Sequence, residues 1–130
     1  MFEATTKAIH VRVEPQFLDE QSNPEDHHYF WAYYVEIENQ STEPVQLRGR
    51  HWRITNGHGA IQEVTGEGVV GEQPVILPGE TYSYTSGAPL GTPSGFMDGE
   101  YKMESAKGED FIVNIPAFSL DSPYDQHIIN

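Results

Sequence analysis

The chain has 130 residues, a length that suits one compact domain, and no linker-like run of Ser, Gly or Pro divides it. Seven basic residues stand against twenty acidic ones, and the formal charge of −13 disfavours nucleic acid and anionic membranes as partners. There are no cysteines, which excludes disulfides, thiolate metal sites and cysteine nucleophiles.

The first part of the chain predicts two strands joined by a polar loop. Apolar residues alternate with polar ones over residues 7–14, as in a half-buried strand. The stretch DEQSNPEDHH that follows is polar and contains a proline, which indicates an exposed loop. From Tyr29 to Ile37 the odd-numbered residues are apolar, and the first half of this strand is apolar on both faces. Such a strand is central in its sheet or covered at one end.

The middle of the chain predicts a bulged strand and a tight turn. A third strand covers residues 45–54, and its apolar positions change parity between Leu47 and Trp52. An extra residue near Gly49 explains this change, because a bulge exchanges the two faces of a strand. The sequence NGHG then signals a tight turn into a short strand over residues 60–64.

The last part of the chain predicts further strands and one special tyrosine. Pro78 and Gly79 fit the central positions of a type II turn. A strand over residues 81–85 precedes a long loop, SGAPLGTPSG. The segment GEYKM is similar to the tyrosine corner of immunoglobulin folds, in which the Tyr101 hydroxyl would donate to upstream backbone. The polar tail over residues 121–130 is expected to be loosely ordered.

These elements predict the fold class. No window shows convincing helical periodicity, whereas about seven strands with turn signals between them fill the chain. We therefore expect an all-β fold, an immunoglobulin-like or fibronectin type III-like β-sandwich. It forms a single domain over residues 1–130, with the sandwich core over residues 5–118. Neither a signal peptide nor a transmembrane segment is recognisable, so we expect a cytoplasmic location.

A G-x-G-x-x-G string stands at Gly66, Gly68 and Gly71. In a dinucleotide-binding fold such glycines lie between a strand and a helix, whose N-terminus binds the pyrophosphate. Here Pro74 and Pro78 forbid a regular helix. The favoured interpretation is a glycine-rich connection between strands, in which glycine permits positive φ. A backbone nest that binds an anion is the alternative.

Four basic residues precede the glycine string, namely Arg48, Arg50, His51 and Arg53. One interpretation is an anion site, in which they surround a phosphate or carboxylate together with the glycines. The other is pairing with the abundant carboxylates of the chain itself, which the sequence favours. Arginines that converge on glycine amides would support the first interpretation, and arginines held by carboxylates would support the second.

No catalytic or metal-binding constellation is recognisable. The serines lack a G-x-S-x-G elbow, and the six histidines form no H-x-H or H-x-x-x-H pair. Glu25, Asp26 and His27 are interpreted as solvated loop residues and not as a metal site. We therefore expect neither an enzyme nor a resident metal or cofactor.

The aromatic residues around Trp31 have two interpretations. Tyr29, Phe30, Trp31, Tyr33 and Tyr34 fall within six positions, and most of them are expected in the core. Because the strand is apolar on both faces, an aromatic patch left exposed would suit a partner protein or self-association as a homodimer. A free sheet edge would also accept a strand from a partner.

Four segments resemble the bacterial ApaG family. They are VQLRGRHWRITN, VTGEGVVGEQPVILPGE, YSYTSGAPLGTPSGFMDGEYKM and FIVNIPAFSL. The resemblance covers nearly the whole chain, in detail from about residue 29 to residue 120, and it implies a fibronectin type III-like sandwich. The family is also called CorD, after a link to cobalt resistance and magnesium efflux. Its name reflects a gene neighbour that hydrolyses diadenosine tetraphosphate.

The resemblance also implies a function. Related domains in eukaryotic F-box proteins and in a DNA-polymerase-interacting protein look like protein-binding modules. We therefore expect a non-enzymatic protein-interaction module, with a partner of unknown identity and a connection to divalent-cation efflux. The alternative is a protein that binds a nucleotide or pyrophosphate ligand of the diadenosine polyphosphate type at the arginines and glycines described above.

Overall fold

The computed structural model describes residues 1–124, and its long elements are all β-strands. The strands are β1 (Phe2–Thr6), β2 (Ile9–Phe17), β3 (Tyr29–Asn39), β4 (Val45–Asn56), β5 (Ile61–Glu67), β6 (Val75–Ile76), β7 (Thr81–Leu90), β8 (Ser94–Ser105) and β9 (Asp110–Asp121). Two 3-10 helices, η1 (Asp19–Gln21) and η2 (Pro24–Asp26), occupy the loop between β2 and β3. Among these 124 residues, no helix has the length and apolar character needed to cross a membrane.

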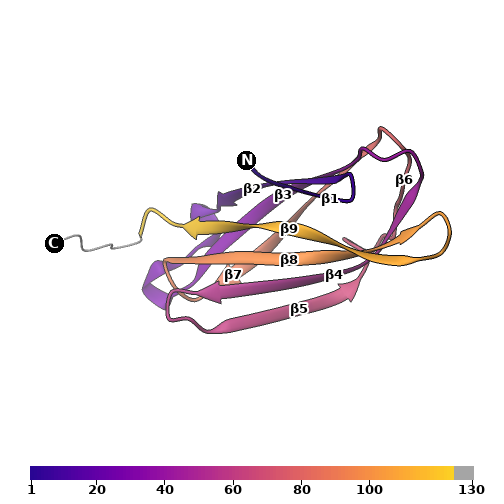
Figure 1. The fold of residues 1–130 in the computed structure, drawn as a ribbon. Helices are drawn as coiled ribbons and strands as arrows, with labels where there is room; N and C mark the ends of the chain where they lie inside the picture. The colour runs from indigo at the N-terminus through magenta and orange to yellow at the C-terminus, as the bar shows by residue number, and fades with distance from the viewer. Residues whose placement is uncertain (125–130) are drawn as a thin grey trace.

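The strands form two antiparallel sheets that pack face to face (Figure 1). Sheet 1 has the order β1-β2-β3-β7. Sheet 2 has the order β5-β4-β8-β9, and β6 also pairs with β4. The all-β sandwich predicted from the sequence is therefore confirmed, and β3 is a central strand of sheet 1, as its two apolar faces predicted.

The core lies between the sheets and is built from alternate residues of every long strand. Val35 and Ile37 of β3 are fully buried, and Trp52 of β4 joins the same core cluster from sheet 2 with 2% of its surface exposed. The Trp52 and Tyr33 ring centroids lie 5.0 Å apart across the sheets. Each fully buried side chain of this size stabilises the fold by about 1.5–3 kcal/mol through loss of apolar surface to water.

The sandwich is closed along one side and open along the other. On the closed side β1 lies beside β9, and the Asn114 N–H donates to Thr6 Oγ1 over 3.2 Å. On the open side β7 ends sheet 1 and β5 ends sheet 2. Within residues 1–124 neither strand has a further strand beside it, so two free edges border the open side.

Two predicted turns are confirmed. Gly79 has φ +82° and the Glu80 N–H donates to Leu77 O over 2.9 Å, as a type II turn with Pro78 and Gly79 at its centre requires. In the NGHG turn, Gly59 has φ +85° and its N–H donates to Asn56 O over 3.0 Å. Glycine adopts these positive φ angles without steric cost.

The prediction of a long loop at SGAPLGTPSG is wrong. β7 continues to Leu90, β8 begins at Ser94, and only residues 91–93 connect them. Gly87 and Pro89 are poor strand formers, but β7 is an edge strand and Pro89 pairs with Phe30 there. An edge position tolerates a proline that has no N–H to donate.

Strands occupy both ends of the part of the chain that the structure describes. At the N-terminus β1 pairs with β2 through a turn in which Lys7 and Ala8 have φ +48° and +64°. At the other end β9 runs to Asp121, and the Ser122 N–H donates to Pro93 O over 3.0 Å. The strands therefore extend beyond the predicted core of residues 5–118. Residues 125–130 of the predicted tail lie outside the described residues.

The tyrosine-corner prediction is wrong in its hydrogen bond. Tyr101 is fully buried, as expected, but its hydroxyl hydrogen-bonds the hydroxyl of Tyr84 and not an upstream backbone group. Tyr84 lies on β7 and Tyr101 on β8, so the bond joins the two sheets. The buried hydroxyl of Tyr84 gives the Tyr101 hydroxyl a hydrogen-bond partner, as a polar group in a core requires.

Candidate functional site

β4 carries the four basic residues for which the sequence left an anion site as the less favoured interpretation, and a bulge places them on different faces. The register of β4 against β8 shifts between Leu47 and Gly49, which leaves Arg48 as the extra residue. The bulge predicted near Gly49 is therefore confirmed. Beyond it, Arg50 shares the inward parity of Trp52, so its side chain leaves the strand on the opposite face from its neighbours.

His51 and Arg53 lie among carboxylates on the outer face of sheet 2. Arg53 Nη2 lies 3.0 Å from Glu100 Oε2, and Arg53 Nε lies 3.1 Å from Asp98 Oδ1. His51 Nδ1 lies 2.7 Å from Glu100 Oε1, and His51 Nε2 lies 2.9 Å from Glu63 Oε1. These contacts join β5, β4 and β8. Hydrogen bonds to Glu100 and Glu63 raise the pKa of His51, and the hydrogen bond from Arg53 lowers the pKa of Glu100.

Arg48 also has an acidic neighbour. Its Nη2 lies 3.3 Å from Glu104 Oε2, and its Nη1 donates to Gln73 Oε1 over 3.0 Å. Three of the four basic side chains therefore contact carboxylates of the chain. This is the arrangement that favours internal pairing over an anion site.

Arg50 is the exception among the four. Its Nη1 donates to the backbone carbonyls of Glu67 over 3.2 Å and Gly68 over 2.9 Å, and among residues 1–124 no carboxylate forms an ion pair with it. The guanidinium lies flat against Gly66, where a Cβ would fall 2.7–2.8 Å from three guanidinium atoms. The first glycine of the string therefore makes room for an arginine.

The other two glycines of the string form a reversal of the chain. Gly68 and Gly71 have φ +61° and +80°. The Val69 N–H donates to Glu72 O over 2.8 Å, and the Glu72 N–H returns a bond of 2.9 Å to Val69 O. The short strand β6 follows, and no helix does. The glycine string is thus a connection between strands, as its sequence favoured, and it lacks the helix N-terminus of a dinucleotide site.

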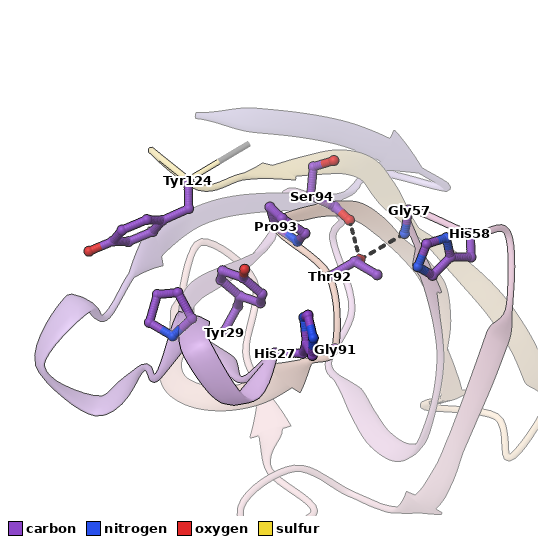
Figure 2. Close-up of a pocket in the computed structure, with 10 residues that line it drawn as sticks. His27, Tyr29, Gly57, His58, Gly91, Thr92, Pro93, Ser94 and Tyr124 are labelled. Atoms are coloured by element: carbon purple, nitrogen blue, oxygen red, sulfur yellow. Dashed lines mark hydrogen bonds between the residues drawn. The ribbon is translucent and has the colours of Figure 1, made fainter. Parts of the chain in front are cut away.

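A cavity of about 480 Å³ lies at one end of the sandwich, where the loop before β3 meets the NGHG turn and the β7–β8 connection. Figure 2 shows Tyr29 and Tyr124 on one side of it and His58 on the other. Thr92 Oγ1 fixes its rim, because it accepts from the Gly57 N–H over 2.8 Å and donates to a carbonyl of its own loop. The walls are aromatic and polar.

The described residues contain no group of three or more His, Cys, Asp and Glu side chains arranged to hold a metal ion. Glu25 and Asp26 belong to η2, and His27 follows it with φ +55°. All three are exposed. The structure thus places the loop residues that the sequence interpreted as solvated at the surface.

β3 sorts the aromatic cluster by parity. Tyr29, Trp31 and Tyr33 are buried, which confirms that most of the cluster belongs to the core. Phe30 and Tyr34 lie on the outer face of sheet 1, and Tyr34 exposes 37% of its surface. Outward residues of the neighbouring strand β7 continue this surface. We call the whole set the apolar strip: Phe30, Ala32, Tyr34, Gly87 and Pro89.

The apolar strip borders the free edge formed by β7. This strand is ten residues long and contains no charged side chain, whereas β5, the other free edge, carries Glu63 and Glu67. An edge strand presents unpaired backbone N–H and C=O groups along one side. Sequence reasoning did not find this edge, because Gly87 and Pro89 led to the prediction of a loop there.

The chain is similar to known proteins over most or all of its length. The family profile described as the ApaG domain matches residues 19–105. The chain is similar to Protein ApaG of Bradyrhizobium sp. (strain ORS 278), at 58% identity, and to Protein ApaG of Parvibaculum lavamentivorans, at 54%, and each alignment covers all of both chains. Among solved structures, an ApaA protein from Bordetella pertussis matches with a TM-score of 0.87 at 46% identity, over 90% of this chain and 95% of that one.

Proposed function

The chain belongs to the ApaG family, and from that premise we propose that it is a non-enzymatic protein-interaction module. The observation that carries the proposal is the free, uncharged edge of β7 beside the apolar strip. We place the module in the cytoplasm, as expected from the sequence, and, as the family resemblance implies, we connect its partner with cobalt resistance and magnesium efflux.

The β7 edge suits the addition of a strand from a partner. Backbone N–H and C=O groups along its outer side supply the hydrogen bonds, and side chains of an added strand reach the apolar strip on the outer face of sheet 1. Edge strands that avoid pairing are commonly protected by charged residues or proline. β7 has no charged residue and its proline, Pro89, lies near its end, so the segment before Pro89 is the part open to pairing. The chain as a whole has a formal charge of −13, which favours a partner segment flanked by basic residues.

The alternative, a nucleotide or pyrophosphate site, has less support. Arg48, His51 and Arg53 each contact a carboxylate of the chain, so a phosphate would have to displace these partners. Gly68 and Gly71 serve a chain reversal that is followed by a strand. No observation in residues 1–124 specifically favours this function over the interaction module.

The test is a capture experiment with matched variants. The wild-type chain, Tyr34→Arg and Phe96→Arg are used as baits in cells grown with cobalt. Phe96 is the control because it exposes 48% of its surface but lies on sheet 2, away from the strip. We expect one partner to be recovered with wild type and with Phe96→Arg and to be lost with Tyr34→Arg.

Other outcomes distinguish the alternatives. A partner that Tyr34→Arg retains and Phe96→Arg loses would contradict the placement on the strip. Recovery of no partner in repeated experiments would count against the module itself. A concentration-dependent dimer in sedimentation, abolished by Tyr34→Arg, would identify the partner as a second copy of the chain.

A further inference from the structure

A cleft of about 150 Å³ opens between the two free edges of the sandwich. Gln62 and Val64 of β5 line it from one side, and Ser86 and Ala88 of β7 line it from the other. Tyr33, Arg50, Trp52, Ile54 and Met97 line it from the strands between these edges. Its volume is about that of a cavity that admits one benzene ring. Gly87 and Pro89 of the apolar strip also line the cleft, so the two surfaces meet along β7.

Two residues that line the cleft, Arg50 and Trp52, carry hydrogen-bond donors without acceptors within residues 1–124. Arg50 uses Nη1 for the carbonyls of Glu67 and Gly68, and no hydrogen bond involves its Nη2 or Nε within residues 1–124. Trp52 is 2% exposed, and its buried Nε1 has no partner in the same part of the chain. A buried donor without an acceptor is costly, and such a group calls for an explanation.

The charge of the cleft is opposite to that of the chain. None of its lining residues is acidic, although the chain has twenty acidic residues. Arg50 is the one charged residue among those that line it. Gly66 leaves room for the guanidinium because it has no side chain. Burial raises the pKa of Tyr33, and its hydroxyl hydrogen-bonds Ser86.

We propose that this cleft binds a small aromatic carboxylate of about the size of benzoate. The carboxylate accepts from Arg50, and the ring lies among Val64, Ala88 and Met97. One guanidinium balances one negative charge, whereas a phosphate dianion would leave a net negative charge in a chain that is already strongly acidic. The apolar walls favour a ring over a hydrated inorganic ion. This inference does not depend on the proposed interaction module.

NMR titration tests the proposal with three probes: sodium benzoate, neutral benzamide and pyrophosphate. The reporters are the indole N–H of Trp52 and the methyl group of Met97. We expect benzoate to shift both signals in the millimolar range. Benzamide, which keeps the ring and loses the charge, should bind at least about tenfold more weakly, because hydrogen bonds to charged groups are the stronger ones.

Two variants locate the charge that is recognised. Arg50→Gln should weaken benzoate binding by about tenfold or more, whereas Arg53→Gln, on the outer face, should leave it unchanged. If Arg50→Gln does not fold, Arg50→Lys keeps a charge but loses the planar donor arrangement, and it should still weaken binding. Three results would overturn the proposal: equal shifts with benzamide, unaltered binding by the Arg50 variant, or no Trp52 shift at about 20 mM benzoate. A stronger response to pyrophosphate would overturn it in favour of a phosphate ligand.

Discussion

The hydroxyl of Tyr84 on sheet 1 hydrogen-bonds the hydroxyl of Tyr101 on sheet 2, inside the core of the sandwich. β7 has a strand neighbour on one side only, within residues 1–124. The tyrosine pair is therefore a second attachment for the strand whose free edge is proposed to bind a partner. Burial raises the pKa of both phenols, which keeps them protonated and able to hydrogen-bond.

Removal of one hydroxyl from this pair should destabilise the fold. Tyr101→Phe leaves the Tyr84 hydroxyl buried without a partner, and we expect a loss of about 1–3 kcal/mol in the free energy of unfolding. Tyr84→Phe should cost a similar amount. Urea denaturation of both single variants and of the double variant gives the coupling energy. Strictly additive losses would show that the hydroxyls do not interact.

Gly66 should be needed for the observed position of the Arg50 side chain, because any larger residue would contact the guanidinium. Gly66→Ala places a methyl group against the Arg50 guanidinium, which must swing away and give up its bonds to the carbonyls of Glu67 and Gly68, and we expect a loss of about 1 kcal/mol in the free energy of unfolding. Gly49→Ala is the matched control, because a Cβ there lies 3.4 Å from its nearest neighbour, Gly66 O. Thermal and urea denaturation compare the two. Equal stability of both variants would contradict the close packing of Arg50.

The network around His51 should make stability depend on pH. Glu100 and Glu63 raise the pKa of folded His51 above its unfolded value, so its contribution is fully present below the unfolded pKa, about 6.5. It is lost as pH rises through the raised folded pKa. We expect His51→Gln to lower the melting temperature near pH 6 and to change it less near pH 9.

His58→Gln is the control for this pH dependence, since His58 is exposed in the NGHG turn. Glu100 sets the acid limit of the pH range in which the network stabilises the fold. Arg53 lowers its folded pKa, so its contribution is present above the unfolded pKa and is lost as pH falls through the folded value. A His51→Gln effect that stayed constant from pH 6 to about pH 9 would contradict the network.

Thr92 should hold the β7–β8 connection to the NGHG turn. Thr92→Val keeps the shape of the side chain but removes the bonds to the Gly57 N–H and the Ser94 carbonyl. Because Thr92 is buried, we expect a loss of about 1–3 kcal/mol in the free energy of unfolding. Thr81→Val, at an exposed position of β7, serves as the control in the same denaturation series.

Local patterns predicted much of this fold. The alternation from Tyr29 to Ile37 identified the core face of β3, and the parity change after Leu47 identified the bulge of β4. The second half of β7 was missed because Gly87 and Pro89 resemble loop residues. Only their pairing with β3 makes that segment a strand, and pairing between distant segments is not visible in local sequence.

The candidate sites were less predictable than the fold. The sequence identified Arg50 and Arg53 as members of one basic cluster but could not separate them. Arg53 contacts Glu100, which is 47 residues away, through the register of β4 on β8. Arg50 enters the side of the sandwich between β5 and β7, and that side exists only after both sheets have formed. The register of β4 on β8 and the packing of the two sheets therefore decide which basic residues pair with carboxylates of the chain.

Hydrogen exchange of the β7 backbone amides tests the central claim most directly. The measurement compares the isolated chain with its complex with the captured partner, and it includes the Tyr34→Arg variant. The account predicts that the Thr81–Leu90 amides that point away from β3, toward the free edge, exchange more slowly in the wild-type complex. The Tyr34→Arg variant should lose this protection. A stable complex in which β7 exchange is unchanged would contradict strand addition at this edge.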